Sequence, residues 1–122
     1  MEKTNRWMIP DMYFPSENVP GPVFGHEAIC VLNAGDVDAD VEITLYFEDR
    51  EPTPMQKCTC PARRTAHIRM DLIRSAAGEP VPQDVPYAAI LTSNVKLAVQ
   101  YSRADARQNA LAIMTTMAYP ID

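Results

Sequence analysis

The chain has 122 residues, which suits one domain spanning residues 1–122 and leaves no room for a second independent core. Hydrophobic residues make up 47% of the sequence and the formal net charge is -5, a composition unlike that of disordered or fibrous proteins. The sequence pI of about 4.9 disfavours a general nucleic-acid binder, because phosphate contacts need a basic face.

The amino-terminal residues lack the apolar core of a secretory signal. A membrane-spanning helix needs about 20 apolar residues, and no run in the sequence approaches that length. The longest candidate, residues 110–119, also carries Thr115 and Thr116. We therefore expect a cytoplasmic protein.

Eleven prolines separate short apolar runs, a pattern typical of strands joined by turns. Four of them fall in residues 10–22 and predict a proline-rich, irregular opening loop. Residues 26–32 predict a strand with Ile29 and Val31 on one face. A turn follows at residues 33–36, where Gly35 can adopt a positive φ.

Residues 41–48 show the clearest alternation, with apolar side chains at the odd positions and mostly polar ones at the even positions. This pattern predicts one buried and one exposed face. Residues 55–60 and 65–70 predict a hairpin around the turn 61–64. A short helical turn is predicted near residues 72–77.

Residues 87–92, 97–103 and 110–119 predict the last three strands. The final one carries small or apolar residues on both faces, as a strand does when both of its sides are covered, and the second cover is expected to be another subunit. The total of seven or eight short strands predicts an all-β, single-domain antiparallel β-sandwich. A small closed barrel is the alternative.

The sequence offers little catalytic chemistry. It holds no nucleophile, phosphate-loop or dinucleotide motif, and its two histidines have no motif context. The three cysteines, Cys30, Cys58 and Cys60, are expected to be free thiols. Residues 36–40 begin like a calcium loop, but Val41 and Phe47 stand where glycine and glutamate are needed. We expect no enzyme activity, no cofactor and no metal.

Charge is unevenly distributed along the chain. Residues 36–51 hold seven acids and one arginine, a balance of -6, whereas residues 57–74 hold five bases and one acid, a balance of +4. This polarity either steers a partner or reflects two solvated faces. The polar cluster at residues 103–109 is either a binding loop or a structural loop fixed by an Arg–Asp pair.

The sequence resembles the family of soluble, cyanobacterial-type sensory rhodopsin transducers over residues 7–119. Family-like segments occur in family order and with family-like spacing. They are His26-Glu27, Leu32-Asn33-Ala34-Gly35-Asp36, Val41-Glu42-Ile43-Thr44, Pro61-Ala62-Arg63-Arg64-Thr65, His67, Arg69, Ser93-Asn94-Val95, Val99-Gln100, Arg103, Asp105, Arg107-Gln108 and Ala118-Tyr119.

The resemblance implies a jelly-roll-like β-sandwich assembled as a homotetramer. It also implies a non-enzymatic signalling protein that binds the cytoplasmic side of a retinal-containing sensory rhodopsin. The acidic balance suits that partner, because cytoplasmic loops of membrane proteins are rich in Lys and Arg. Family members have also been linked to DNA, a partner that the low pI of this chain disfavours.

The wider superfamily implies an alternative, a module that binds a sugar or related small molecule without any rhodopsin. On that interpretation a pocket or subunit groove collects the polar residues of the matched segments. These are His26, Glu27, Asn33, Arg64, His67, Arg69, Gln100, Arg103, Asp105 and Arg107. Glu27 and Asn33 share the face of Ile29 and Val31, so both must lie near strand ends to be solvated. The longer 71–86 segment, the opening loop and the Cys58-Thr59-Cys60 segment depart from the family pattern.

Overall fold

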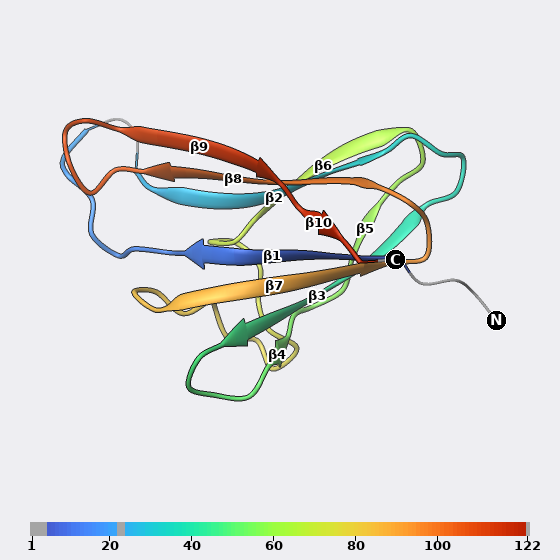
Figure 1. The fold of residues 1–122 in the computed structure, drawn as a ribbon, viewed down its shortest axis with the longest axis horizontal. Helices are drawn as coiled ribbons and strands as arrows, with labels where there is room; N and C mark the ends of the chain where they lie inside the picture. The colour runs from blue at the N-terminus through green and yellow to red at the C-terminus, as the bar shows by residue number, and fades with distance from the viewer. Residues whose placement is uncertain (1–4, 22–23, 122) are drawn as a thin grey trace.

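The computed structural model describes residues 5–21 and 24–121, and in these residues the chain forms two antiparallel sheets stacked face to face (Figure 1). This arrangement confirms the predicted all-β sandwich. Ten strands are present rather than seven or eight. They are β1 (Asn5–Tyr13), β2 (His26–Asn33), β3 (Ala39–Phe47), β4 (Thr53–Pro54), β5 (Cys58–Cys60), β6 (Arg64–Arg69), β7 (Pro86–Ser93), β8 (Ala98–Asp105), β9 (Ala112–Met117) and β10 (Tyr119–Pro120).

The first sheet has the strand order β10-β1-β7-β3-β4, and β5 also pairs with β3. The second sheet has the order β6-β2-β8-β9. Among the described strands the chain crosses between the sheets at six connections, which are β1–β2, β2–β3, β5–β6, β6–β7, β7–β8 and β9–β10 (Figure 1). The described residues thus form two open sheets and not the closed barrel that was the alternative prediction.

The core lies between the sheets and is built by strict alternation. On β3, Val41, Ile43 and Leu45 are buried while their outward neighbours are exposed or half-buried, as the sequence predicts. On β2, Ile29 and Val31 are buried in the same way. Burial of such side chains contributes about 1.5–3 kcal/mol each relative to exposure, which fixes the register of both sheets.

Strand β1 was not predicted, because residues 10–13 were assigned to the opening loop. The structure instead places them in β1 of the first sheet, where β7 alone is their neighbour among the described strands because β10 pairs only with Trp7 and Met8. The irregular segment follows Tyr13. The pairing of β1 with β7 shifts in register between Ile9 and Met12. This bulge accommodates Pro10, which has no N–H to donate to a neighbouring strand.

The predicted hairpin of residues 55–60 and 65–70 is wrong. Strand β5 pairs with β3 of the first sheet and β6 pairs with β2 of the second, so the 61–64 turn carries the chain between sheets. Arg63 in this turn has the positive φ of 55°, whereas Gly35 does not adopt a positive φ. The described residues contain no helix, but near the predicted helical turn of residues 72–77 a single turn forms, in which the carbonyl of Arg69 accepts hydrogen bonds from the N–H groups of Leu72 and Ile73.

The predicted final strand is divided in two by Ala118. Its side chain is buried, and its N–H donates a hydrogen bond to the carbonyl of Val99 at 3.0 Å. These contacts hold the chain at the point where it leaves the second sheet. Strand β9 therefore stays on the edge of the second sheet, and β10 pairs with β1 in the first.

Candidate functional site

Among the described residues, the one acidic or basic side chain in the buried core is that of Glu27, which is 1% exposed. Alternation along β2 forces it inward, on the same face as Ile29 and Val31. Tyr87 donates its hydroxyl to Oε1 at 2.6 Å, and Tyr101 donates to Oε2. The backbone N–H of Tyr13 also donates to Oε2, at 2.9 Å. We call these four groups the Glu27 cluster.

The Glu27 cluster joins the two sheets. Glu27 and Tyr101 belong to β2 and β8 of the second sheet, whereas Tyr13 and Tyr87 belong to β1 and β7 of the first. Hydrogen bonds to an ionised carboxylate are about twice as strong as neutral ones, and a buried carboxylate without them is strongly disfavoured. The cluster therefore fixes the spacing and the relative position of the sheets at this end of the sandwich.

Burial raises the pKa of the Glu27 carboxyl above its ordinary value, because the desolvation of the charge outweighs the bonds from Tyr101, Tyr87 and the Tyr13 backbone. The positive charge of Arg103 acts in the opposite direction. The same burial, together with the nearby carboxylate, raises the pKa of the Tyr87 and Tyr101 hydroxyls. Both tyrosines are thus fixed as hydrogen-bond donors.

The raised pKa predicts a pH dependence of stability. Between the ordinary pKa of 4.5 and the higher native pKa, the folded chain binds more protons than the unfolded chain. We expect the contribution of Glu27 to the free energy of unfolding to fall as pH rises through this window and to level off above it. Urea unfolding at a series of pH values measures this, and subtraction of the same series for Glu27→Gln isolates the carboxyl.

Asp105 provides an internal contrast for this measurement. Its hydrogen bond from Arg107 lowers its pKa below 3.8, so its contribution is lost only at lower pH, as the native pKa is passed. Tyr87→Phe removes a hydrogen bond that favours the charged form of Glu27, so the native pKa of Glu27 should rise further. The pH range over which stability falls should then become wider. An unchanged difference between the wild type and Glu27→Gln across the window would contradict the assignment.

Arg103 lies opposite Glu27 in the β2–β8 pairing and is half-buried. Its Nη2 lies 3.4 Å from the thioether sulfur of Met114 on β9. Beside it, a groove of about 370 Å³ opens between β1 and β9, lined in part by Asp11, Tyr101, Met114 and Thr116. One wall of this groove is thus the ring of a tyrosine from the Glu27 cluster.

The loop after β8 is held by an ion pair, as one of the two interpretations of the sequence expects. Arg107 donates to both carboxylate oxygens of Asp105, with the shortest distance, Nη2 to Oδ2, at 2.7 Å. The guanidinium of Arg107 also lies 5.5 Å from the ring centre of Tyr13. Arg103, Asp105 and Arg107 therefore gather near the Glu27 cluster.

The other predicted ligand residues lie elsewhere. Asn33 is fully buried at the far end of β2, where its side-chain amide donates to the carbonyls of Val37 and Cys60, and Arg64 lies opposite it on β6. Arg69 makes a two-pronged ion pair with Asp71, with its closest contact at 2.8 Å. These residues contribute to no common cavity with Arg103.

His67 and Gln100 flank Cys30 in one row across the outer face of the second sheet. With Met117 they line a shallow hollow of about 240 Å³. His26 lies on this outer face near the other end of β2, with Nδ1 3.2 Å from the carbonyl of Phe24. The ten predicted site residues thus occupy several separate places, and their role in ligand binding stays a prediction.

Sequence reasoning missed Tyr13, Tyr87 and Tyr101 as functional neighbours of Glu27. The signal that could have found the cluster was present, because a carboxylate at an inward position needs buried donors. Glu27 does lie near a strand end, as the parity argument required, but it is not solvated. The partners themselves come from strands far apart in sequence, so no local pattern identifies them.

The described residues hold no group of three or more histidine, cysteine or acidic side chains that could bind a metal ion. The three cysteines are free thiols. Burial raises the pKa of the Cys58 thiol. Among the described residues, no helix is long and apolar enough to cross a membrane.

Two stacked antiparallel sheets joined by a buried carboxylate cluster define an all-β sandwich protein, and comparison with known proteins identifies its family. The family described as Anabaena sensory rhodopsin transducer matches residues 3–120. This chain therefore belongs to the Anabaena sensory rhodopsin transducer family.

The solved structures that are similar to the chain include the following two. The Anabaena sensory rhodopsin transducer is 42% identical, with a TM-score of 0.69 over 80% of this chain and 91% of that one. The crystal structure of Thermotoga maritima 1070 is 33% identical, with a TM-score of 0.81 over 98% of this chain and 96% of that one. No curated protein sequence matches the chain.

Proposed function

We propose that this protein is a non-enzymatic signal transducer that binds a sensory rhodopsin at the cytoplasmic side of the membrane. The observation that carries the proposal is the family match over residues 3–120, together with the likeness to a protein named as the transducer of such a receptor.

The alternative of a sugar-binding module receives no particular support. Its predicted residues are spread over both ends of β2 and the outer face of the second sheet, as described above. Several of their polar groups already bind protein atoms, including those of Asn33, Arg69 and Arg107. DNA is disfavoured by the net charge of -5.

Self-association through β9 is a further part of the proposal. Every residue of β9 is exposed in the single chain, and Ile113 and Met117 are 71% and 63% exposed. Leu111, just before the strand, and Met114, within it, add two more exposed apolar side chains to this edge of the sandwich. A free edge strand with apolar side chains and no charge or proline is a template for pairing with another chain. We propose that a second copy covers it, within the homotetramer that the sequence resemblance implies.

A direct binding measurement tests the rhodopsin partner. A sensory rhodopsin is reconstituted in lipid nanodiscs, and binding of the labelled protein is followed by fluorescence anisotropy in the dark and under illumination. We expect saturable binding to rhodopsin nanodiscs and none to empty nanodiscs of the same lipids. Equal binding to both, or none to either at micromolar receptor, would refute the rhodopsin partner and leave the family assignment intact.

A further inference from the structure

The outer face of the first sheet is an exposed surface with an apolar middle. Met8 and Tyr119 lie side by side in the pairing of β1 with β10, and Met8 faces Ile90 on β7. Tyr46 lies opposite Ala88 on the neighbouring pair. Met8, Tyr46 and Tyr119 are 36%, 38% and 66% exposed, so this face carries apolar side chains that no described residue covers.

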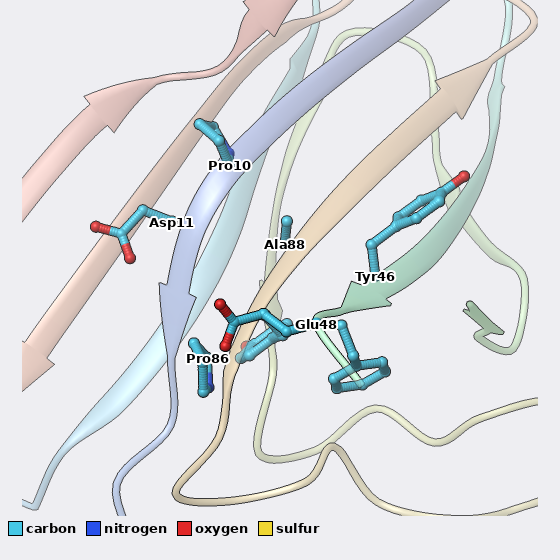
Figure 2. A pocket seen from close by; sticks show the side chains of 8 residues that line it. Pro10, Asp11, Tyr46, Glu48, Pro86 and Ala88 are labelled. Atoms are coloured by element: carbon cyan, nitrogen blue, oxygen red, sulfur yellow. The ribbon is translucent and has the colours of Figure 1, made fainter. Parts of the chain in front are cut away.

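At one end of this face lies a hollow of about 250 Å³, which we call the outer hollow. Its lining comes from three strands: β1 supplies Pro10 and Asp11, β7 supplies Pro86 and Ala88, and β3 with the residue after it supplies Tyr46 and Glu48 (Figure 2). Figure 2 shows Glu48 reaching across β7 toward β1, whereas the carboxylate of Asp11 extends from the far side of β1, away from Glu48. The volume is that of a side chain rather than of a large ligand.

The charge at the outer hollow is negative. Asp11 and Glu48 are both exposed, and neither forms an ion pair with any cation among the described residues. Phe47, one of the aromatic residues that line the hollow, has the guanidinium of Arg50 4.9 Å from its ring centre, and Arg50 forms an ion pair with Asp49. A Lys or Arg side chain is favoured in such a place, because it can form an ion pair with the carboxylate and a cation–π contact with an aromatic ring.

The wider distribution of charge agrees with this polarity. The acidic stretch of residues 36–51 runs through β3, whose even-numbered side chains point out from the first sheet. The basic stretch of residues 57–74 includes β6, at the edge of the second sheet. The two stretches meet at the ion pairs Lys57–Glu42, at 3.2 Å, and Arg63–Asp36, at 3.9 Å, so part of the acidic charge is compensated there. Glu48, after β3, has no such partner among the described residues, and the charge around the outer hollow therefore attracts cations.

We propose that the outer face of the first sheet docks a basic segment of a protein partner, with one Lys or Arg side chain of that segment in the outer hollow. Apolar residues of the segment cover Met8, Tyr46 and Ile90. The assignment of the segment to a membrane receptor rests on the proposed function, because cytoplasmic loops of membrane proteins are rich in Lys and Arg. The docking surface itself is defined by charge and shape on this chain.

A peptide titration followed by ¹H–¹⁵N NMR tests the surface. The probe is the capped peptide Gly-Arg-Lys-Leu-Arg-Gly, added to millimolar concentration at low salt. We expect shifts confined to amides near residues 8–11, 46–48 and 86–90. The double variant Asp11→Asn/Glu48→Gln should weaken binding by about tenfold, and Tyr46→Ala should weaken it by a smaller factor.

The matched control is Asp40→Asn/Glu79→Gln, which removes the same two charges from exposed sites that do not line the outer hollow and form no ion pair with any described residue. Its affinity should stay within about twofold of the wild type, as expected for screened, distant charges. Equal losses in both double variants, shifts centred on other strands, or no binding of the peptide would each overturn the proposal. A smaller oligomer for Asp11→Asn/Glu48→Gln in sedimentation would identify the occupant as a second copy and overturn it too.

The rhodopsin nanodisc measurement separates this proposal from the proposed function. Peptide binding at the outer hollow without rhodopsin binding would refute only the receptor partner. Rhodopsin binding that is unchanged in Asp11→Asn/Glu48→Gln would refute only the docking surface. Well-dispersed amide spectra of each variant establish that the substitutions leave the fold intact.

Discussion

Replacement of Glu27 by alanine is expected to destabilise the protein by about 4 kcal/mol or more. The substitution leaves three buried donors without an acceptor, namely the hydroxyls of Tyr87 and Tyr101 and the N–H of Tyr13. Each unsatisfied buried donor costs about 1–3 kcal/mol, and the cavity left by the side chain adds to the loss. Since domains are stable by about 5–15 kcal/mol, this variant should lie near the limit of folding.

One effect opposes this loss. The carboxylate of Glu27 is itself disfavoured by burial, so its removal relieves a desolvation cost. Replacement of a whole buried polar group by apolar residues can be neutral for this reason, but here the donors of the cluster remain. We therefore expect the unsatisfied donors on both sheets to outweigh this relief, so that Glu27→Ala lowers the free energy of unfolding.

Urea or thermal unfolding of a short series measures the effect. Tyr87→Phe leaves Oε1 without its donor and should cost about 2 kcal/mol, less than Glu27→Ala. Glu51→Ala, at an exposed position, should lie within about 0.5 kcal/mol of the wild type. A free energy of unfolding for Glu27→Ala within about 1 kcal/mol of the wild type would show that the cluster does not hold the sheets together.

Local alternation explains which parts of the fold could be predicted from the sequence. Along β3 the apolar residues Val41, Ile43 and Leu45 recur with a period of two, so both the strand and its buried face are visible in the sequence. The same holds for Ile29 and Val31 on β2. Such patterns require only that one face of a strand is buried, which is a local property.

Strand β1 and the pairing of β5 could not be predicted in this way. In β1, Pro10 and Asp11 interrupt the apolar pattern, and the bulge between Ile9 and Met12 that accommodates them is fixed by β7, some 80 residues away along the chain. The short β5 carries too few residues to specify a partner, and its place beside β3 depends on the 61–64 turn. Both outcomes are decided by tertiary pairing.

The candidate site divides along the same line. The Arg107–Asp105 pair is local, and it matches the interpretation of residues 103–109 as a structural loop fixed by an Arg–Asp pair. The Glu27 cluster collects donors from β1, β7 and β8, so its existence follows from the sequence but its members do not. The outer hollow likewise needs three strands from both halves of the chain. Sequence patterns identify which residues need partners, and topology supplies the partners.

Introduction of a charge on β9 is expected to separate the subunits of the proposed homotetramer. Ile113 points away from the second sheet and is 71% exposed in the single chain, so a glutamate there costs the isolated fold little. Thr116 lies on the opposite side of the strand, beside the groove next to Tyr101. In an interface between copies, either Ile113→Glu or Thr116→Glu would bury an unpaired charge, at a cost of several kcal/mol.

A cost of about 4 kcal/mol weakens association by about a thousandfold. We expect this to convert a tetramer to smaller species at micromolar concentration. Sedimentation velocity across a concentration series measures the change in mass. Leu72→Glu is the matched control, because it adds the same charge to an apolar side chain that is 69% exposed but lies away from β9. Wild-type mass for both β9 variants would place the interface elsewhere, whereas loss of the oligomer in Leu72→Glu as well would attribute the effect to net charge. Dissociation confined to the β9 variants would mean that the exposed apolar edge of the single chain is the buried seam of the assembly.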